Sequence, residues 1–136
     1  MGTWDVKTFD NDVASDWALD LEDSRDLSVV QAALKAVLSR GNDDLDADVA
    51  CEGLAACEVI ARLQGRWGPR DAYTRSIDEW VQAHPQTPPS ALLRDALLVV
   101  DRVLRAPSEL LDVWTESPDL EAWQRSVSDL RARLAG

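Results

Sequence analysis

The side chains best suited to chemistry form a short oxygen-rich run near the N-terminus: Asp10, Asn11, Asp12 and Asp16. Carboxylate and amide oxygens are the ligands that Mg²⁺ and Ca²⁺ prefer, so a metal or ligand site is one interpretation. The run lacks the Asp-x-Asp-x-Asp-Gly spacing of a calcium loop. Asp12 and Asp16 would be the pair for acid–base chemistry, but no nucleophile, histidine partner or phosphate-binding loop accompanies them. We expect Asp10 or Asn11 to cap a helix and Asp12 to favour its first turn.

A second candidate site is the loop that carries Arg66, Trp67 and Arg70. Two guanidinium groups beside a flat indole ring could bind an anion. The alternative is that Trp67 anchors the loop to the core while the arginines are solvated or paired with carboxylates.

Histidine and cysteine chemistry is poorly supported. His84 is the only histidine, and its place before Pro85 at a helix end favours a structural or exposed role. Cys51 and Cys57 lie six residues apart on one helix, about 9 Å along its axis, which is too far for a disulfide. With no third ligand nearby they do not form a zinc site, and we expect buried thiols. No metal or other cofactor is expected.

Acidic residues are concentrated in the first part of the chain. Residues 1–60 contain 14 acidic and four basic residues, whereas residues 61–136 contain 11 and ten. Such a charge repels nucleic acid and anionic membranes and attracts basic proteins. We therefore expect a basic protein partner, with solubility alone as the alternative. The candidate partner-binding residues are Asp12, Asp16, Asp20 and Asp23 at helical spacing, with Asp43, Asp44 and Asp48.

These residues must be positioned by helices, and the chain is organised around one of them, residues 46–65. Between Ala47 and Leu63 this stretch is apolar in almost all directions, which is typical of a helix inside a bundle. Its small residues permit close approach of neighbouring helices. Asp46 is predicted to be the N-cap, and Gly65 to end the helix in the left-handed conformation.

The rest of the chain shows helical periodicity and no strand pattern. We predict an all-α, single-domain bundle spanning residues 1–136, with about five longer and two short helices. The first helix is predicted to begin after Asp10 or Asn11 and to end near 23, and the second to begin near 26 or 28 and to end at 40. The others are predicted over 46–65, about 72–83, from Pro88-Pro89 through 104, over 109–115, and from Ser117-Pro118 through 134. Trp17, Trp80, Trp114 and Trp123 lie on their apolar faces and should be core residues.

Three segments carry a resemblance to a known family. They are Gly2-Thr3-Trp4 followed by Phe9-Asp10-Asn11-Asp12-x-Ala14-x-Asp16-Trp17, then Leu45-Asp46-Ala47, and Ser108-Glu109-Leu110-Leu111-Asp112-x-Trp114. Together they resemble a bacterial family catalogued as domain of unknown function 4259. The resemblance implies a small helical domain and brings no activity with it.

The leading functional hypothesis is a non-enzymatic, acidic protein-binding module, of the kind found among immunity proteins and antitoxins. A second hypothesis is a small metal- or ligand-dependent enzyme with its site near Trp4 and Asp10–Asp16. A third is a self-associating structural subunit, and the oligomeric state stays open. No signal peptide or membrane helix pattern is present, and we expect a cytoplasmic protein. Trp4 and Phe9 are predicted to bury against the bundle as a structural clasp.

Overall fold

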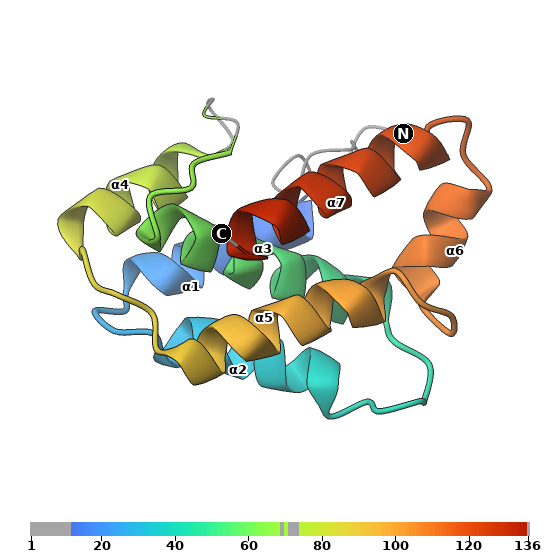
Figure 1. Cartoon of the computed structure of the whole chain (residues 1–136), viewed down its shortest axis with the longest axis horizontal. Helices are drawn as coiled ribbons and strands as arrows, with labels where there is room; N and C mark the ends of the chain where they lie inside the picture. The colour runs from blue at the N-terminus through green and yellow to red at the C-terminus, as the bar shows by residue number, and fades with distance from the viewer. Residues whose placement is uncertain (1–11, 69, 71–73, 136) are drawn as a thin grey trace.

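Seven helices make up the part of the chain that the computed structural model describes, which is residues 12–68, 70 and 74–135 (Figure 1). No β-strand occurs in this part, so the all-α prediction is confirmed. None of these helices is long and apolar enough to cross a membrane. The helices are α1 (Asp12–Glu22), α2 (Ser28–Leu38), α3 (Ala47–Leu63), α4 (Arg75–Ala83), α5 (Ser90–Val103), α6 (Glu109–Thr115) and α7 (Leu120–Ala135).

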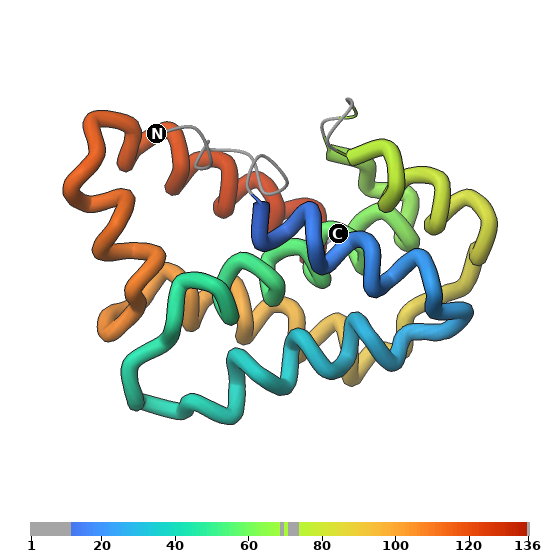
Figure 2. Tube along the Cα trace, turned by 180° about the vertical axis from the view of Figure 1, so that it is seen from behind, coloured from blue at the N-terminus to red at the C-terminus, as the bar shows by residue number. Residues whose placement is uncertain are grey.

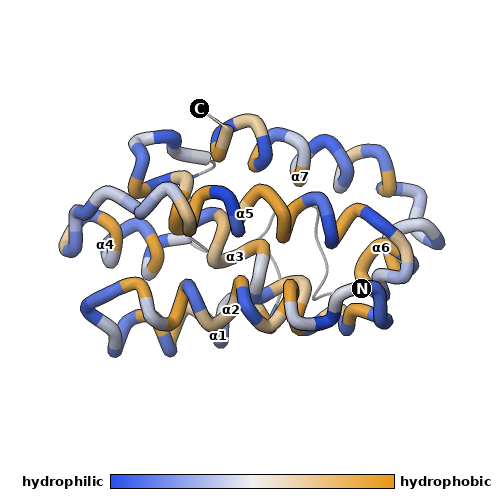
Figure 3. Tube along the Cα trace, turned by 60° about the horizontal axis from the view of Figure 1, so that its bottom comes forward, coloured by the Kyte–Doolittle hydropathy of each residue, from blue (hydrophilic) through white to orange (hydrophobic). Residues whose placement is uncertain are grey.

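Helix α3 is the centre of the bundle, as its all-round apolar pattern predicts. Each of the other six described helices packs against it. Figures 2 and 3 show α3 lying between its neighbours, with α1 on the opposite side of it from α5. Small residues allow this crowding. A methyl group added at Gly53 would lie 2.6 Å from Val37 Cγ2 of α2 and 3.2 Å from Val99 Cγ1 of α5.

The core consists of the residues that the helical patterns predict. Trp17, Trp80, Trp114 and Trp123 are all buried, and the last two stack with ring centroids 6.0 Å apart. This stacking joins α6 to α7. Leu19 on α1 and Leu98 on α5 are the large apolar residues that stay exposed among those described.

The ends of α3 confirm one prediction and correct another. Gly65 has a φ of +83°, the left-handed conformation expected of a residue that ends a helix. Asp46 stands at the N-cap position, but its side chain makes no capping hydrogen bond. Its carboxylate lies 3.3 Å from Arg40 Nη2 instead. The free N–H group of Ala47 donates to Glu109 Oε1 at 2.7 Å. The cap is therefore supplied from 62 residues away.

Glu109 reaches α3 because the α2–α3 loop lies beside the α5–α6 loop. Leu45 and Ser108 form an isolated parallel bridge, in which the N–H of Glu109 donates to the carbonyl oxygen of Leu45 at 2.9 Å. The N–H of Leu45 donates to the carbonyl oxygen of Pro107 at 3.3 Å. Two of the three segments that carry the family resemblance therefore contact each other, and their contact is structural.

Candidate functional site

The acidic residues of α1 are all on its solvent side. Asp12, Asp16 and Asp20 are exposed, and so is Asp23, which follows the last residue of the helix. We call these four residues the acidic face. None of them forms an ion pair with another residue among those described. The opposite side of α1 is buried against the bundle by Ala14, Trp17, Ala18 and Leu21.

An exposed leucine lies within the acidic face. The side chain of Leu19 is 57% exposed. It is three residues from Asp16 and four from Asp23, so all three are neighbours on the helix surface. Apolar and acidic groups are therefore mixed on the same solvent-facing side of α1.

Helix α3 adds two more carboxylates near the acidic face. Asp48 is exposed and Glu52 is partly buried. Burial raises the pKa of Glu52, and the negative charges of Asp20 and Asp48 raise it further. The carboxylates of α1 and α3 are thus close enough to repel one another. Glu52 was not among the sequence-predicted site residues, because its proximity to Asp20 depends on how α1 packs on α3.

The other two predicted acidic residues lie elsewhere. Asp43 and Asp44 are exposed in the α2–α3 loop, which Figures 1 and 2 place away from α1, beyond the C-terminal end of α2. The carbonyl oxygen of Asp43 accepts a hydrogen bond from Arg102 Nη2 at 2.6 Å. The structure therefore divides the seven predicted residues into two groups, with Asp48 joining the α1 group.

The predicted metal or ligand site falls partly outside the described residues. Asp12 and Asp16 are described and exposed, whereas Asp10 and Asn11 are not among the described residues. Within residues 12–68, 70 and 74–135, no group of three or more His, Cys, Asp or Glu side chains could hold a metal ion. The predicted clasp of Trp4 and Phe9 also lies outside the described part.

In the loop after α3, Trp67 is half-buried and packs against the core, as the alternative interpretation of this loop predicted. The guanidinium carbon of Arg70 lies 4.4 Å from the centroid of the Trp67 ring, within the range of a cation–π contact. Arg70 Nε is 3.8 Å from Asp78 Oδ2, and its side chain is half exposed. Arg66 is exposed, and its carbonyl oxygen accepts a hydrogen bond from Arg133 at 3.4 Å.

Beneath this loop is a buried ionic network that the sequence analysis missed. Arg62 of α3 is fully buried and donates from Nε to Asp78 Oδ1 at 2.8 Å and from Nη1 to Glu58 Oε1 at 3.0 Å. Arg133 of α7 lies 2.7 Å from Glu58 Oε1 through its Nη1. Thr74 Oγ1 donates to Asp78 Oδ2 at 2.6 Å. In the sequence, this network is indicated by Glu58 and Arg62, which lie four residues apart on a helix that is otherwise apolar on nearly every side.

The cysteines and the histidine have structural surroundings. Cys51 and Cys57 are free and buried, as predicted. Burial, with the charges of Asp48 and Glu52, raises the pKa of Cys51 to about 12, so its thiol stays protonated at neutral pH. His84 is partly buried and stacks on Trp80 with ring centroids 4.8 Å apart. Neither residue type is part of a nucleophile–base arrangement in the described part of the chain.

A known family of protein domains matches most of the chain. The model of the family described as Domain of unknown function (DUF4259) matches residues 2–126. No curated protein and no solved structure matches the chain significantly.

Proposed function

The chain belongs to the DUF4259 family of domains of unknown function, and we propose that it is a non-enzymatic module that binds a basic partner protein through the acidic face. The family carries no activity to transfer. The proposal therefore depends on the charges of this chain and on how its helices present them.

The observation that supports the proposal is that the exposed aspartates of the acidic face are grouped on one side of α1 and have no ion-pair partner among the described residues. Elsewhere, carboxylates such as Glu58 and Asp78 form ion pairs with arginines, whereas others, such as Glu79, form none with a described residue. Uncompensated like charges destabilise the folded state. A basic surface that docks on α1 would remove this repulsion, so the face is better suited to a complex than to the free protein.

The shape of the face suits a protein more than a small ligand. Helix α1 has 11 residues and is about 16 Å long, and its exposed carboxylates are spread along this length instead of converging on one point. A stable interface buries about 800 Å² on each partner, which requires contact beyond α1 alone. Asp48 and Glu52 would extend the contact onto α3. Leu19 would supply apolar contact among the charges.

Neutralisation of a toxin fits these properties. Complementary charge mainly speeds association, and an inhibitor of a toxic protein benefits from fast capture. We therefore propose an immunity- or antitoxin-like role in the bacterial cytoplasm. A gene for a basic nuclease or a secreted toxin next to this gene would support it.

The test uses two variants with the same net charge. In the first, Asp12, Asp16, Asp20 and Asp23 are replaced by asparagine. In the matched control, the carboxylates of four exposed residues outside α1 become amides: Glu79, Asp112, Glu116 and Asp119. Immobilised wild type and both variants are used to capture proteins from the native host, and captured partners are then titrated by calorimetry.

We expect a partner that is retained by the wild type and the control and lost by the α1 variant. Its affinity should fall as salt rises from 0.1 to 1 M, because the Debye length falls from about 10 Å to about 3 Å. A partner that binds the α1 variant equally well, or whose affinity ignores salt, would contradict the proposal.

A further inference from the structure

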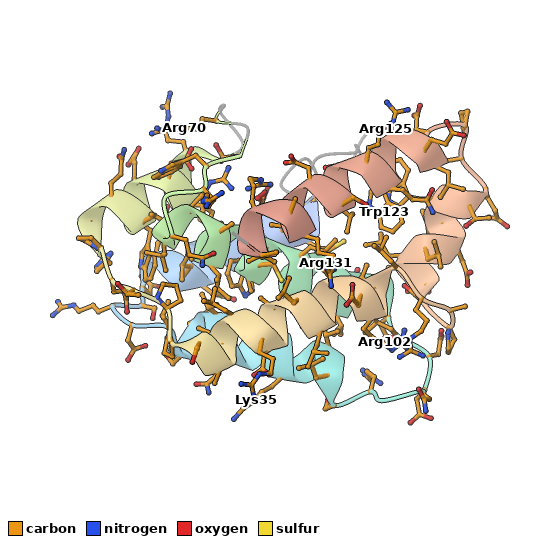
Figure 4. The ribbon with its side chains drawn as sticks, viewed as in Figure 1. Lys35, Arg70, Arg102, Trp123, Arg125 and Arg131 are labelled. Carbon is orange, nitrogen blue, oxygen red and sulfur yellow. The ribbon has the colours of Figure 1, made fainter. Side chains whose placement is uncertain are left out.

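A groove that shares no residue with the acidic face has a different chemistry. It lies between the C-terminal ends of α2 and α5 and has a volume of about 320 Å³, the lower end of the range for small-molecule sites. Leu38 and Leu98 line its apolar part, and Asn42, Asp101, Arg102 and Arg105 line its polar part. Figure 4 labels Arg102 at the end of α5, facing the α2–α3 loop.

Arg102 is held rigidly by neutral partners. Its side chain donates to the carbonyl oxygens of Gly41 at 2.9 Å, Asp43 at 2.6 Å, Arg105 at 2.9 Å and Pro107 at 2.8 Å. A guanidinium group has five N–H donors, so one N–H on Nη1 has no acceptor among the described residues. The carbonyl groups orient the cation but do not neutralise it.

No carboxylate compensates this charge by direct contact within the described residues. The carboxylate of Asp101 is already bound by Arg131, at 2.8 and 3.2 Å. The negative charge of Asp44 raises the pKa of Arg102, but the two side chains form no ion pair. Arg102 is 4% exposed and lines the groove, so water reaches little of its side chain. A cation shielded from water without a carboxylate in contact is costly, and an anion in the groove would lower that cost.

Arg105 adds a second cation at the polar end. It is exposed, and its Nη1 lies 3.4 Å from Asn42 Oδ1, a long and weak hydrogen bond. Arg102 and Arg105 both line the groove. Burial lowers the pKa of Arg102, and the positive charge of Arg105 lowers it further. Two such groups with planar donors suit a carboxylate.

We propose that this groove binds a small carboxylic acid with a short apolar tail. The carboxylate would lie against Arg105, the free N–H of Arg102 and the Asn42 amide, and the tail against Leu38 and Leu98. Leu98 is 49% exposed, so apolar surface is available for such a tail. The inference does not depend on the proposed partner protein, because the two surfaces share no residue.

The test is an NMR titration of the full ¹⁵N-labelled chain with hexanoate at constant pH and ionic strength. We expect saturating shifts confined to the amides of residues 38–42 and 98–105, with a dissociation constant on the order of 1 mM. Acetate should bind at least several-fold more weakly because it lacks the tail. Inorganic phosphate should bind more weakly than hexanoate for the same reason.

Two pairs of variants locate the site. Arg105→Gln should weaken hexanoate binding about tenfold or more, whereas Arg94→Gln, which removes an exposed arginine from the same helix, should not. Leu98→Asn should also weaken binding, whereas Leu19→Asn on α1 should not. Circular dichroism checks that all four variants fold. Three results would each overturn the proposal. The first is chemical-shift changes spread beyond residues 38–42 and 98–105, and the second is acetate or phosphate binding as tightly as hexanoate. The third is an Arg105→Gln variant that binds hexanoate like the wild type.

Discussion

Replacing Arg62 by methionine should lower the free energy of unfolding by about 3–5 kcal/mol, the usual cost of breaking a buried ion pair from one side. The side chain of Arg62 is 0% exposed, and those of its partners Asp78 and Glu58 are 7% and 4% exposed. Solvent therefore cannot replace the lost contacts. Methionine retains much of the apolar volume of the arginine stem, so the change tests the charge more than the packing.

The cost should be concentrated at Asp78. Glu58 would keep Arg133, which contacts its two carboxylate oxygens at 2.7 and 3.1 Å. Asp78 would keep only the hydroxyl of Thr74 and the distant, half-exposed Arg70 among the contacts described above. We therefore expect Arg62→Met to cost more than Arg133→Met, because it leaves the buried carboxylate of Asp78 with no described cation closer than the half-exposed Arg70 at 3.8 Å.

The assay is equilibrium unfolding in urea, monitored by circular dichroism. Tryptophan fluorescence is less suitable, because the emission of Trp67 could change locally when Arg62 is lost. With an m-value of about 2 kcal/mol per molar urea, a loss of about 3–5 kcal/mol moves the midpoint down by about 1.5–2.5 M. The matched control is Arg131→Met, which removes an arginine from an exposed pair with Asp101. Its midpoint should stay close to that of the wild type.

Two results would refute this reasoning. Equal midpoints for Arg62→Met and Arg131→Met would mean that the network contributes no more than a surface pair. A midpoint for Arg62→Met above that of the wild type would mean that the desolvation cost of burying these charges exceeds the energy of their attraction. The double variant Arg62→Met/Asp78→Asn should recover part of the loss, since the unpaired charge is removed as well.

Three further changes test other parts of the fold. Burial and nearby carboxylates raise the pKa of Glu52 above its usual 4.5. The stability due to its neutral form is therefore present below about pH 4.5 and is lost as the pH rises through the pKa of the folded state. For this reason Glu52→Gln should raise the melting temperature at pH 7 and change it little near pH 4. Gly53→Ala should destabilise by about 1–3 kcal/mol despite the higher helix propensity of alanine, and Val37→Ala should rescue it by removing the methyl group 2.6 Å away. Glu109→Ala should cost about 1 kcal/mol in urea unfolding and Asp46→Ala less; the reverse order would mean that Asp46 is the working cap of α3.

The structure also bears on what the family resemblance means. The segments around Leu45 and Ser108 are far apart in the chain, yet they form a bridge and exchange a helix cap. Their residues are therefore explained by folding. The N-terminal segment that carries the third part of the resemblance lies outside the described residues, except for Asp12 to Trp17, of which Ala14 and Trp17 are buried. The prediction that Trp4 and Phe9 form a clasp can be checked by deleting residues 1–9 and measuring the melting temperature.

The helices and their buried faces could be read from the sequence because they depend on local order. Helix periodicity repeats every 3.6 residues, so the all-round apolar pattern of 46–65 was enough to place α3 at the centre. Gly65 and the boundaries of α6 follow from residue types within a few positions. The exposed aspartates of α1 follow from the same periodicity, since they are opposite its apolar face.

Only the tertiary structure decided which charged groups meet. Glu58 and Arg62 are neighbours on α3, but Asp78 and Arg133 come from α4 and α7, and their approach depends on how those helices pack. The same is true of Glu109 at the start of α3 and of Arg102 beside the α2–α3 loop. Hydrogen bonds and ion pairs act over a few ångströms, and segments far apart in the chain reach that distance only after the core has formed. For this reason the sequence predicted the acidic face of α1 but neither the buried network nor the groove.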